Sequence, residues 1–231
     1  MGTGLNLLMR IESRETRPLR SCALTPYPLA LKPRIMDAME FFHNSEGRWR
    51  SQRTTHHLPF RRSESGDSLI RVRCLTPEDD RVKETCAIHD IEVDRSVGGA
   101  AVLWQGSMEW DKEEENHEGE AVFAIVPEMG NAQEGQLLRD RGYAETAPVA
   151  GRYYIDGEDA LVMITDYETM SSLERFWFQT PNLRLRASTV KLFGGLNKAT
   201  FCAETRILEE DTPPPPSLEW DQINLYSSFG W

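Results

Sequence analysis

The sequence predicts a mainly β protein, a single closed antiparallel β-barrel of about nine to ten strands. One helix is expected before the first strand and another between strands two and three. Short strand-like segments follow one another along the chain with turn residues between them, and only one helical pattern interrupts them. A closed barrel follows because closure removes the exposed edges that such strands would otherwise present.

The composition fits one domain with extensions at both ends. We predict a leader at residues 1–35, a barrel at 36–208 and a tail at 209–231. Hydrophobic residues make up 39% of the 231 residues, which is enough for one core. The net charge of −11 argues against a nucleic-acid partner, which needs a basic surface. No apolar run approaches the ~20 residues of a membrane span, so no transmembrane segment is predicted.

The two ends differ in charge from the middle of the chain. Residues 1–35 hold six basic and two acidic residues together with four prolines. They predict a cleavable organelle transit peptide, a disordered extension, or a stretch upstream of a working start at Met36. Residues 209–231 hold five acidic residues and no Lys or Arg, and Pro213–Pro216 cannot join a sheet.

The elements are expected in the following order. Met36–Ser45 reads as a short helix, with Asp37 at its positive end and Phe41 and Phe42 on its apolar side. The strands are expected over residues 48–60, 68–75, 100–111, 120–127, 149–155, 160–169, 174–180, 183–193 and 198–208.

Caps and turns punctuate this series. A second helix is predicted from Thr76, as its cap, to about His89. Asp156-Gly157 predicts a hairpin turn. Pro181-Asn182 and Gly194-Gly195 separate the last three strands.

The opening strand carries the first functional signal. Gly47-Arg48-Trp49 follows a short helix and resembles the opening of a lipocalin-like barrel. The polar run after it still reads as a strand, which makes sense if one face lines a wet cavity for an anionic, partly apolar ligand. Alternation places Trp49 and Arg53 on one face and His56 on the other, so a bulge would be needed to bring them together.

Two later strands have unusual faces. Trp104, Met108 and Trp110 share one face, which predicts either a packed core or a flat wall for a conjugated ligand. Arg184 and Arg186 share one face of another strand. Spacing alone favours both arginines in solvent, and the alternative is a clamp for carboxylates inside a cavity.

Carboxylates and cysteines complete the candidates. Glu174 shares a face with Phe176 and Phe178, and Glu168 shares one with Ile164. A carboxylate among apolar neighbours is either a surface residue at a strand end or an inward acceptor with a raised pKa. The four cysteines show no paired spacing and read as buried thiols, and no metal-binding or phosphate-binding motif is present.

Several long segments resemble the S-type phycobiliprotein lyases. They are FFHNSEGRWRSQRTTHHL, GSMEWD, EGQLLRDRGYAETAPVAGRYY, TDYETMSSLERFWFQTPNLRLRAS and KATFCAE, in order from about Met36 to about Ile207. The resemblance implies a calycin barrel that binds a phycobilin non-covalently. It also implies that the protein attaches this bilin by a thioether bond to a specific cysteine of an apo-phycobiliprotein subunit.

The resemblance also implies roles for individual residues. It places Glu174, His56 and Arg53 in catalysis. It implies no metal and no cofactor, with phycoerythrobilin, phycocyanobilin or 15,16-dihydrobiliverdin as the bound substrate. The implied bilin-binding residues are Arg184, Arg186, Trp110, Met108, Glu168 and Trp49.

The implied partner is an apo-phycoerythrin or apo-phycocyanin subunit, with the β subunit favoured. A homodimer, or a heterodimer with a related lyase, is also expected. The location is the plastid for a nuclear-encoded algal protein, and otherwise the cyanobacterial cytoplasm. The alternative functions are a non-catalytic calycin carrier of a tetrapyrrole or fatty acid, and an assembly chaperone for phycobiliproteins.

Overall fold

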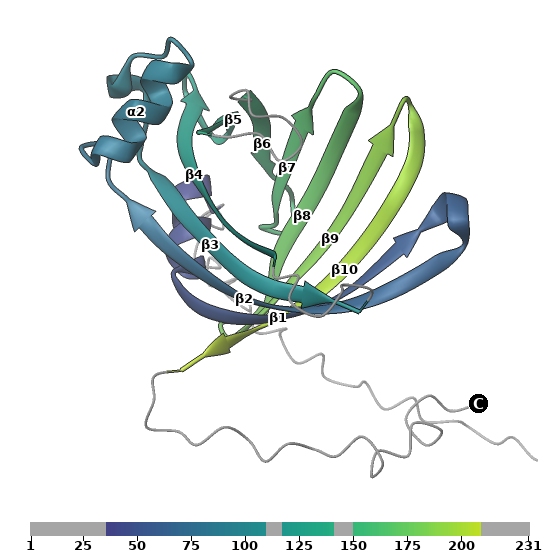
Figure 1. Ribbon diagram of the computed structural model, residues 1–231. Helices are drawn as coiled ribbons and strands as arrows, with labels where there is room; N and C mark the ends of the chain where they lie inside the picture. The colour runs from purple at the N-terminus through teal and green to yellow at the C-terminus, as the bar shows by residue number, and fades with distance from the viewer. Residues whose placement is uncertain (1–35, 110–116, 141–149, 209–231) are drawn as a thin grey trace, which may run out of the picture. The chain divides into compact units, whose positions relative to one another are not determined.

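The computed structural model describes residues 36–109, 117–140 and 150–208 (Figure 1). The chain divides into two units, residues 1–34 and 35–231, and the described residues all belong to the second. Ten strands in the described part form a closed barrel in which each strand pairs with the next, and β1 pairs with β10. They are β1 (Gly47–His57), β2 (Arg62–Leu75), β3 (Gly99–Met108), β4 (His117–Glu128), β5 (Asn131–Arg139), β6 (Ala150–Ile155), β7 (Leu161–Asp166), β8 (Met170–Thr180), β9 (Leu183–Leu192) and β10 (Gly195–Ile207).

Two helices accompany the barrel, in the order that the sequence predicts. Helix α1 (Ala38–Ser45) precedes β1, and Asp37 caps it by accepting a hydrogen bond from the Glu40 N–H at 2.8 Å. Helix α2 (Asp80–Ile88) lies between β2 and β3. The predicted fold class of an antiparallel barrel with these two helices is therefore confirmed.

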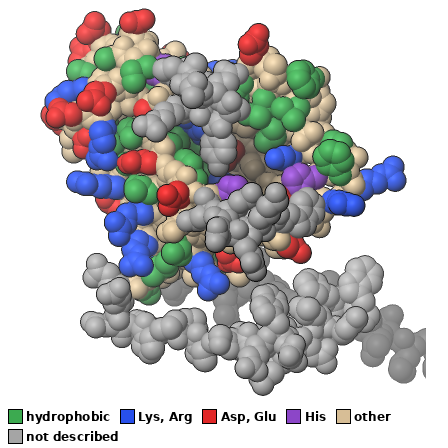
Figure 2. Space-filling view, viewed as in Figure 1, with side chains coloured by type: hydrophobic (Ala, Val, Ile, Leu, Met, Phe, Trp, Pro, Cys, Tyr) green, Lys and Arg blue, Asp and Glu red, His purple; other side chains and the backbone are tan. Residues whose placement is uncertain are grey.

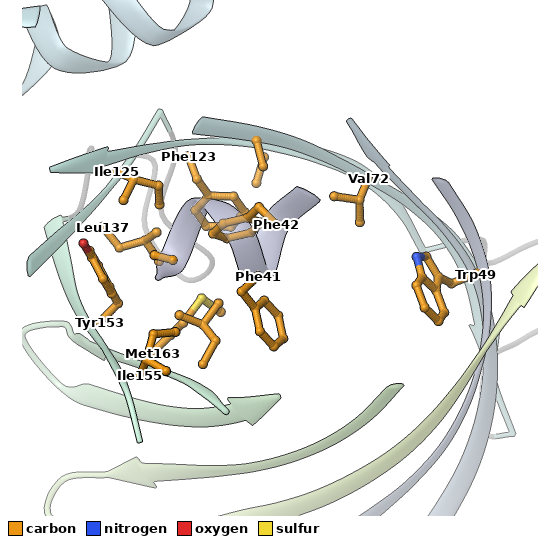
Figure 3. Close-up of a cluster of buried hydrophobic side chains, with 14 residues drawn as sticks. Phe41, Phe42, Trp49, Val72, Phe123, Ile125, Leu137, Tyr153, Ile155 and Met163 are labelled. Carbon is orange, nitrogen blue, oxygen red and sulfur yellow. The ribbon is translucent and has the colours of Figure 1, made fainter. Parts of the chain in front are cut away.

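Helix α1 lies inside the ring of strands at one end of the interior (Figure 3). Its Phe41 ring lies 5.1 Å from that of Phe178, and its Phe42 ring lies 6.4 Å from that of Phe123. Leu137, Tyr153 and other apolar side chains pack around these rings. We call this end of the interior the base.

Helix α2 covers the outer face of the sheet over β3, β4 and β5. Val82 and Cys86 of α2 pack against Val122 and Ala124 of β4. Strand β4 is thus covered on both faces, by α2 outside and by the base inside, and it is buried continuously from Ala121 to Val126. This explains why its sequence is a continuous apolar run and does not alternate.

The structure corrects three details of the predicted elements. Strand β5 was not predicted, because Asn131–Arg139 is mostly polar and contains Gly135. Helix α2 is capped by Asp79, whose carboxylate accepts from the Arg81 N–H, so the predicted Thr76 cap is wrong. Leu58–Phe60 does not extend β1 but forms a 3-10 turn toward β2.

The predicted turns follow the strands as expected. The Asp156-Gly157 hairpin joins β6 and β7, although Asp159, with φ of 56°, takes the left-handed position in place of the glycine. Gly47 has φ of 122°, a backbone conformation that other residues rarely adopt, which explains the glycine of the Gly-x-Trp opening. Among the described residues, no helix is long and apolar enough to cross a membrane.

Candidate functional site

The barrel interior collects charged side chains from strands that are far apart in sequence. Register fixes which side chains point inward, because residues directly opposite on neighbouring strands share a face. Arg184 lies opposite Glu204, and Arg186 lies opposite both Cys202 and Phe176. We define the central group as six of the inward charged residues: Arg53, Arg139, Arg184, Arg186, Glu174 and Glu204.

Arg184 is held in a buried ion pair. It is 5% exposed and Glu204 is 0% exposed, and the Arg184 Nε and Nη2 atoms each lie 2.6 Å from Glu204 Oε2. Its guanidinium also lies 4.8 Å from the centre of the Trp49 ring. Burial lowers the pKa of Arg184, and the attraction of Glu204 opposes that shift. Arg184 thus has little free capacity to clamp a ligand.

Arg186 shares its donors among several weaker partners. Its Nη1 lies 3.4 Å from Glu174 Oε1, its Nη2 lies 3.2 Å from Cys202 Sγ, and its Nε lies 3.5 Å from Glu204 Oε1. Burial disfavours its charge, but the attraction of Cys202, Glu204 and Glu174 outweighs burial and raises the pKa of Arg186. The guanidinium stays charged and is open to a better acceptor.

Arg139 is a site residue that the sequence analysis missed. It lies at the end of β5, is 6% exposed, and its guanidinium lies 4.8 Å from the centre of the Phe123 ring. Its Nη2 lies 3.8 Å from Glu174 Oε2, so Glu174 lies between Arg139 and Arg186. Arg139 belongs to the quoted segment EGQLLRDRGY. It lies two residues after the apolar Leu137, and this alternation is the signal that could have placed the Arg139 side chain inside the barrel.

Arg53 and Met108 meet across β1, β2 and β3. The Arg53 Nη2 contacts the Met108 sulfur, and both side chains are half-buried. Gly66 of β2 lies between them, and a Cβ there would come within 2.5 Å of the Met108 sulfur. The glycine therefore makes room for this contact, and the structure brings these two predicted residues together.

The central group holds buried donors that make no hydrogen bond. The Nε atoms of Arg53, Arg139 and Arg186 are buried and make no hydrogen bond to any residue that the structure describes. Such donors are costly to bury, because an unmade hydrogen bond to a charged group forfeits about 1–3 kcal/mol or more. Four arginines face two glutamates in this group, which leaves two positive charges in excess.

Three more predicted residues lie outside the central group as defined, and a fourth lies outside the described residues. Trp49 is fully buried at the base, where its indole N–H donates to the Ser45 carbonyl at 2.8 Å. His56 is exposed on the outer face of β1, and the unbroken register of β1 with β2 and β10 contains no bulge to turn it inward. Glu168 is exposed in the turn between β7 and β8. Trp110 lies outside the described residues.

His57, the neighbour of His56, is the histidine of this strand that faces inward. Its Nε2 lies 2.7 Å from Glu64 Oε1, and the side chains are 15% and 11% exposed. The resemblance instead implied a catalytic role for His56. The correct face follows from Trp49, because residues 49, 51, 53, 55 and 57 alternate inward.

The molecular surface is hollowed near the middle of the face drawn in Figure 2, and histidine side chains lie at the edge of that hollow. The fold and the interior together define a class of protein. It is a calycin-like barrel whose interior is apolar at the base. In the central group, the interior presents arginine donors that make no hydrogen bond.

Comparison with known proteins identifies the family. The model of the CpeS-like proteins matches residues 37–207, so the chain belongs to the CpeS-like family. A chromophore lyase CpcS/CpeS 2 of Synechocystis sp. is 58% identical over 187 residues, covering 80% of this chain and 97% of that protein. The phycocyanobilin lyase subunit CpcS of Picosynechococcus sp. is 54% identical, covering 84% of this chain and 98% of that protein.

A solved structure supports the same assignment. The S-type phycobiliprotein lyase CpeS of Guillardia theta superposes with a TM-score of 0.67 at 28% identity, covering 76% of this chain and 95% of that chain. The resemblance predicted from the quoted segments is therefore confirmed, and so is the lyase family that it implied.

Proposed function

We propose that the protein binds a phycobilin non-covalently in the barrel interior and attaches it to a cysteine of an apo-phycobiliprotein subunit. The excess of two positive charges in the central group carries this proposal, because a bilin has two propionate carboxylates. The buried Nε atoms without partners supply donors for those carboxylates. The names of the relatives, chromophore lyase and phycocyanobilin lyase, support the same reaction.

The attachment is an addition. The thiol of the partner forms a carbon–sulfur bond at the bilin's ethylidene group, the carbon–carbon double bond opens, and the thiol proton is taken up by the tetrapyrrole. Nothing is oxidised and no group leaves. The protein therefore has to hold the bilin in one orientation, exclude competing thiols and water, and manage one proton.

We propose that Glu174 manages that proton. In the protein alone it lies between Arg186 and Arg139, at 3.4 and 3.8 Å. Propionates that take over these guanidinium donors release the Glu174 carboxylate, which can then accept pyrrole N–H groups. A carboxylate there keeps the tetrapyrrole protonated, and a protonated bilin is a better electrophile for the thiol.

Two features support an acceptor cysteine on the partner and not on this chain. Cys202 is fully buried beside Arg186, and Cys86 is buried under α2. Cys74 is half-buried, and burial together with Glu46 raises its pKa to about 11. None of these described thiols is both exposed and readily ionised, which attack on the bilin requires.

We further propose that His56 acts at the surface presented to the partner, since it points away from the interior. The favoured partner is the β subunit of phycoerythrin or phycocyanin, and the protein works as a homodimer or with a related lyase. The location is the plastid or the cyanobacterial cytoplasm. These details rest on the resemblance and on the basic composition of residues 1–35.

A transfer assay tests the proposal. The protein is mixed with phycocyanobilin or phycoerythrobilin and an apo-subunit, and the mixture is then denatured. Colour that stays with the subunit is the expected result. Colour lost from both chains would identify a carrier, and no absorbance change on mixing bilin with the protein would identify an assembly chaperone.

A further inference from the structure

Three side chains of different chemistry converge beside the base of the barrel. His43 lies in the last turn of α1, Glu46 caps the end of that helix, and Cys74 lies near the end of β2. Their ligand atoms (an imidazole nitrogen, a carboxylate oxygen and the thiol sulfur) all lie within 4.8 Å of one another. They come from two elements that are adjacent only in the folded protein.

One hydrogen bond already orients this group. The backbone N–H of Cys74 donates to Glu46 Oε1 at 3.3 Å, which holds the carboxylate beside the thiol. His43 and Glu46 are three residues apart at the end of one helix, so their spacing is set by the backbone. His43 and Glu46 are exposed and Cys74 is half-buried, so the group is accessible from solvent.

The donor set matches a zinc-like ion. Zn²⁺ binds thiolate, imidazole and carboxylate at ~2.0–2.3 Å, which places ligand atoms roughly 3.5 Å apart around it. The ligand atoms lie within 4.8 Å of one another, so binding would require His43 and Glu46 to rotate toward the ion. Calcium and magnesium prefer all-oxygen sites, so the sulfur and nitrogen select against them.

The local charges also favour a cation. The C-terminal end of a helix carries partial negative charge, and Glu46 adds a carboxylate. Arg206 lies near this region, but it donates to the backbone carbonyls of Glu46 and Asn44 and lies 4.2 Å from the centre of the Trp49 ring. Its hydrogen bonds therefore leave the Glu46 carboxylate open.

We propose that His43, Glu46 and Cys74 form a binding site for Zn²⁺ or a similar thiophilic divalent ion, which fastens helix α1 to strand β2. The fourth position of a tetrahedral ion would be left to water. Without metal, Cys74 stays a thiol at neutral pH, because burial and Glu46 raise its pKa to about 11. Metal binding then displaces that proton.

The consequence of the site is mechanical. Phe41 and Phe42 of α1 fill the base, and no disulfide among the described residues links the helix to the sheet. An ion shared by α1 and β2 would hold both rings in place. It would raise thermal stability without touching the central group.

Metal titration of the full chain tests the proposal. After treatment with a chelator, the protein is titrated with Zn²⁺ against a chromophoric competitor, and with Co²⁺ to record the thiolate-to-cobalt charge-transfer band. We expect one ion per chain, that band, and a rise in Tm with Zn²⁺. Cys74→Ser should abolish the band, and His43→Asn should weaken Zn²⁺ binding at least ~100-fold, since even outer partners of a metal site contribute 10–100-fold.

Cys86→Ala is the matched control, because it removes a buried thiol that lies on α2 and outside this group. It should keep the cobalt band and the stoichiometry. The proposal is overturned if no band forms, or if Cys74→Ser and His43→Asn bind Zn²⁺ as the parent does. His43 is exposed, so His43→Asn stays informative even if Cys74→Ser folds poorly.

Discussion

The base and the central group are neighbours in the same interior, yet their polar atoms are treated differently. At the base, the Trp49 indole donates to Ser45, and the adjoining Arg184 is paired with Glu204. In the rest of the central group, Arg53, Arg139 and Arg186 each keep a buried Nε that makes no hydrogen bond among the described residues. The Ser45 hydroxyl at the base is also buried without a hydrogen bond, so it is the charge of the three arginine donors, and not the unmade bond alone, that marks where a ligand completes the structure.

The largest expected effect comes from breaking the Arg184–Glu204 pair. Arg184→Met leaves Glu204 charged and buried, and should cost about 3–5 kcal/mol in the free energy of unfolding. Urea denaturation measures it. The double variant Arg184→Met/Glu204→Leu should recover most of the loss. If the single variant is as stable as the parent, the Arg184–Glu204 pair does not stabilise the fold.

The next effect is on the base itself. Phe41 is 1% exposed and packs against Phe178, so Phe41→Ala should destabilise the protein by about 3–4 kcal/mol through the cavity it leaves. Thermal unfolding measures it, and Phe41→Leu should lose less. A Phe41→Ala variant that keeps its stability but loses bilin affinity would place the base inside the binding site.

Arg139→Gln tests the unsaturated side. It removes a charged donor, together with the guanidinium that packs over the Phe123 ring, and should weaken bilin binding by ~10–100-fold, because a hydrogen bond to a charged group contributes about 1.5–3 kcal/mol. Absorbance titration measures the affinity. A bilin dimethyl ester is the control, since without propionate charges it should bind variant and parent alike. Equal affinities for the free acid would exclude Arg139 from the clamp.

Glu174→Gln should leave the fold intact and change the absorption spectrum of the bound bilin, because a neutral amide lacks the carboxylate charge that keeps the tetrapyrrole protonated. Glu168→Gln is the matched control, since Glu168 is exposed in a turn and should leave the spectrum unchanged. Identical spectra for the Glu174 variant and the parent would remove Glu174 from proton handling.

The smallest effect is expected outside both regions, at the β6–β7 turn. Burial alone would raise the pKa of Asp156, but its hydrogen bonds to Arg175 and to two backbone N–H groups lower it. Because the folded-state pKa is lowered, the stabilisation is present above ~3.9 and is lost as pH falls below it. Asp156→Asn should cost about 1 kcal/mol at pH 7 and less near pH 2.

Denaturation of parent and Asp156→Asn at both pH values measures this difference, and bilin affinity should not change. A difference that stays constant with pH would show that the Asp156 charge does not contribute. A loss of bilin affinity would mean that the outer turn couples to the interior.

The sequence by itself determined the barrel, both helices and the family. Local sequence patterns are enough for these features. Because side chains alternate along a strand, Arg184 and Arg186 must share a face, and Gly47 with Trp49 marks the opening strand. It also predicted that His56 faces away from Arg53, which the unbroken register of β1 confirms. The roles in catalysis and bilin binding stay predictions.

Only the tertiary structure decided which partners each inward charge meets. Strand β5 is polar in sequence and owes its place to pairing with β4 and β6, so Arg139 could not be placed without it. Arg184 and Arg186 are two residues apart on one face and look equivalent in sequence. Glu204, twenty residues beyond Arg184, bonds Arg184 closely but makes only a longer contact with Arg186. Alternation sets the face of a side chain, whereas barrel closure sets its neighbours, and those neighbours decide which donors are left for a ligand.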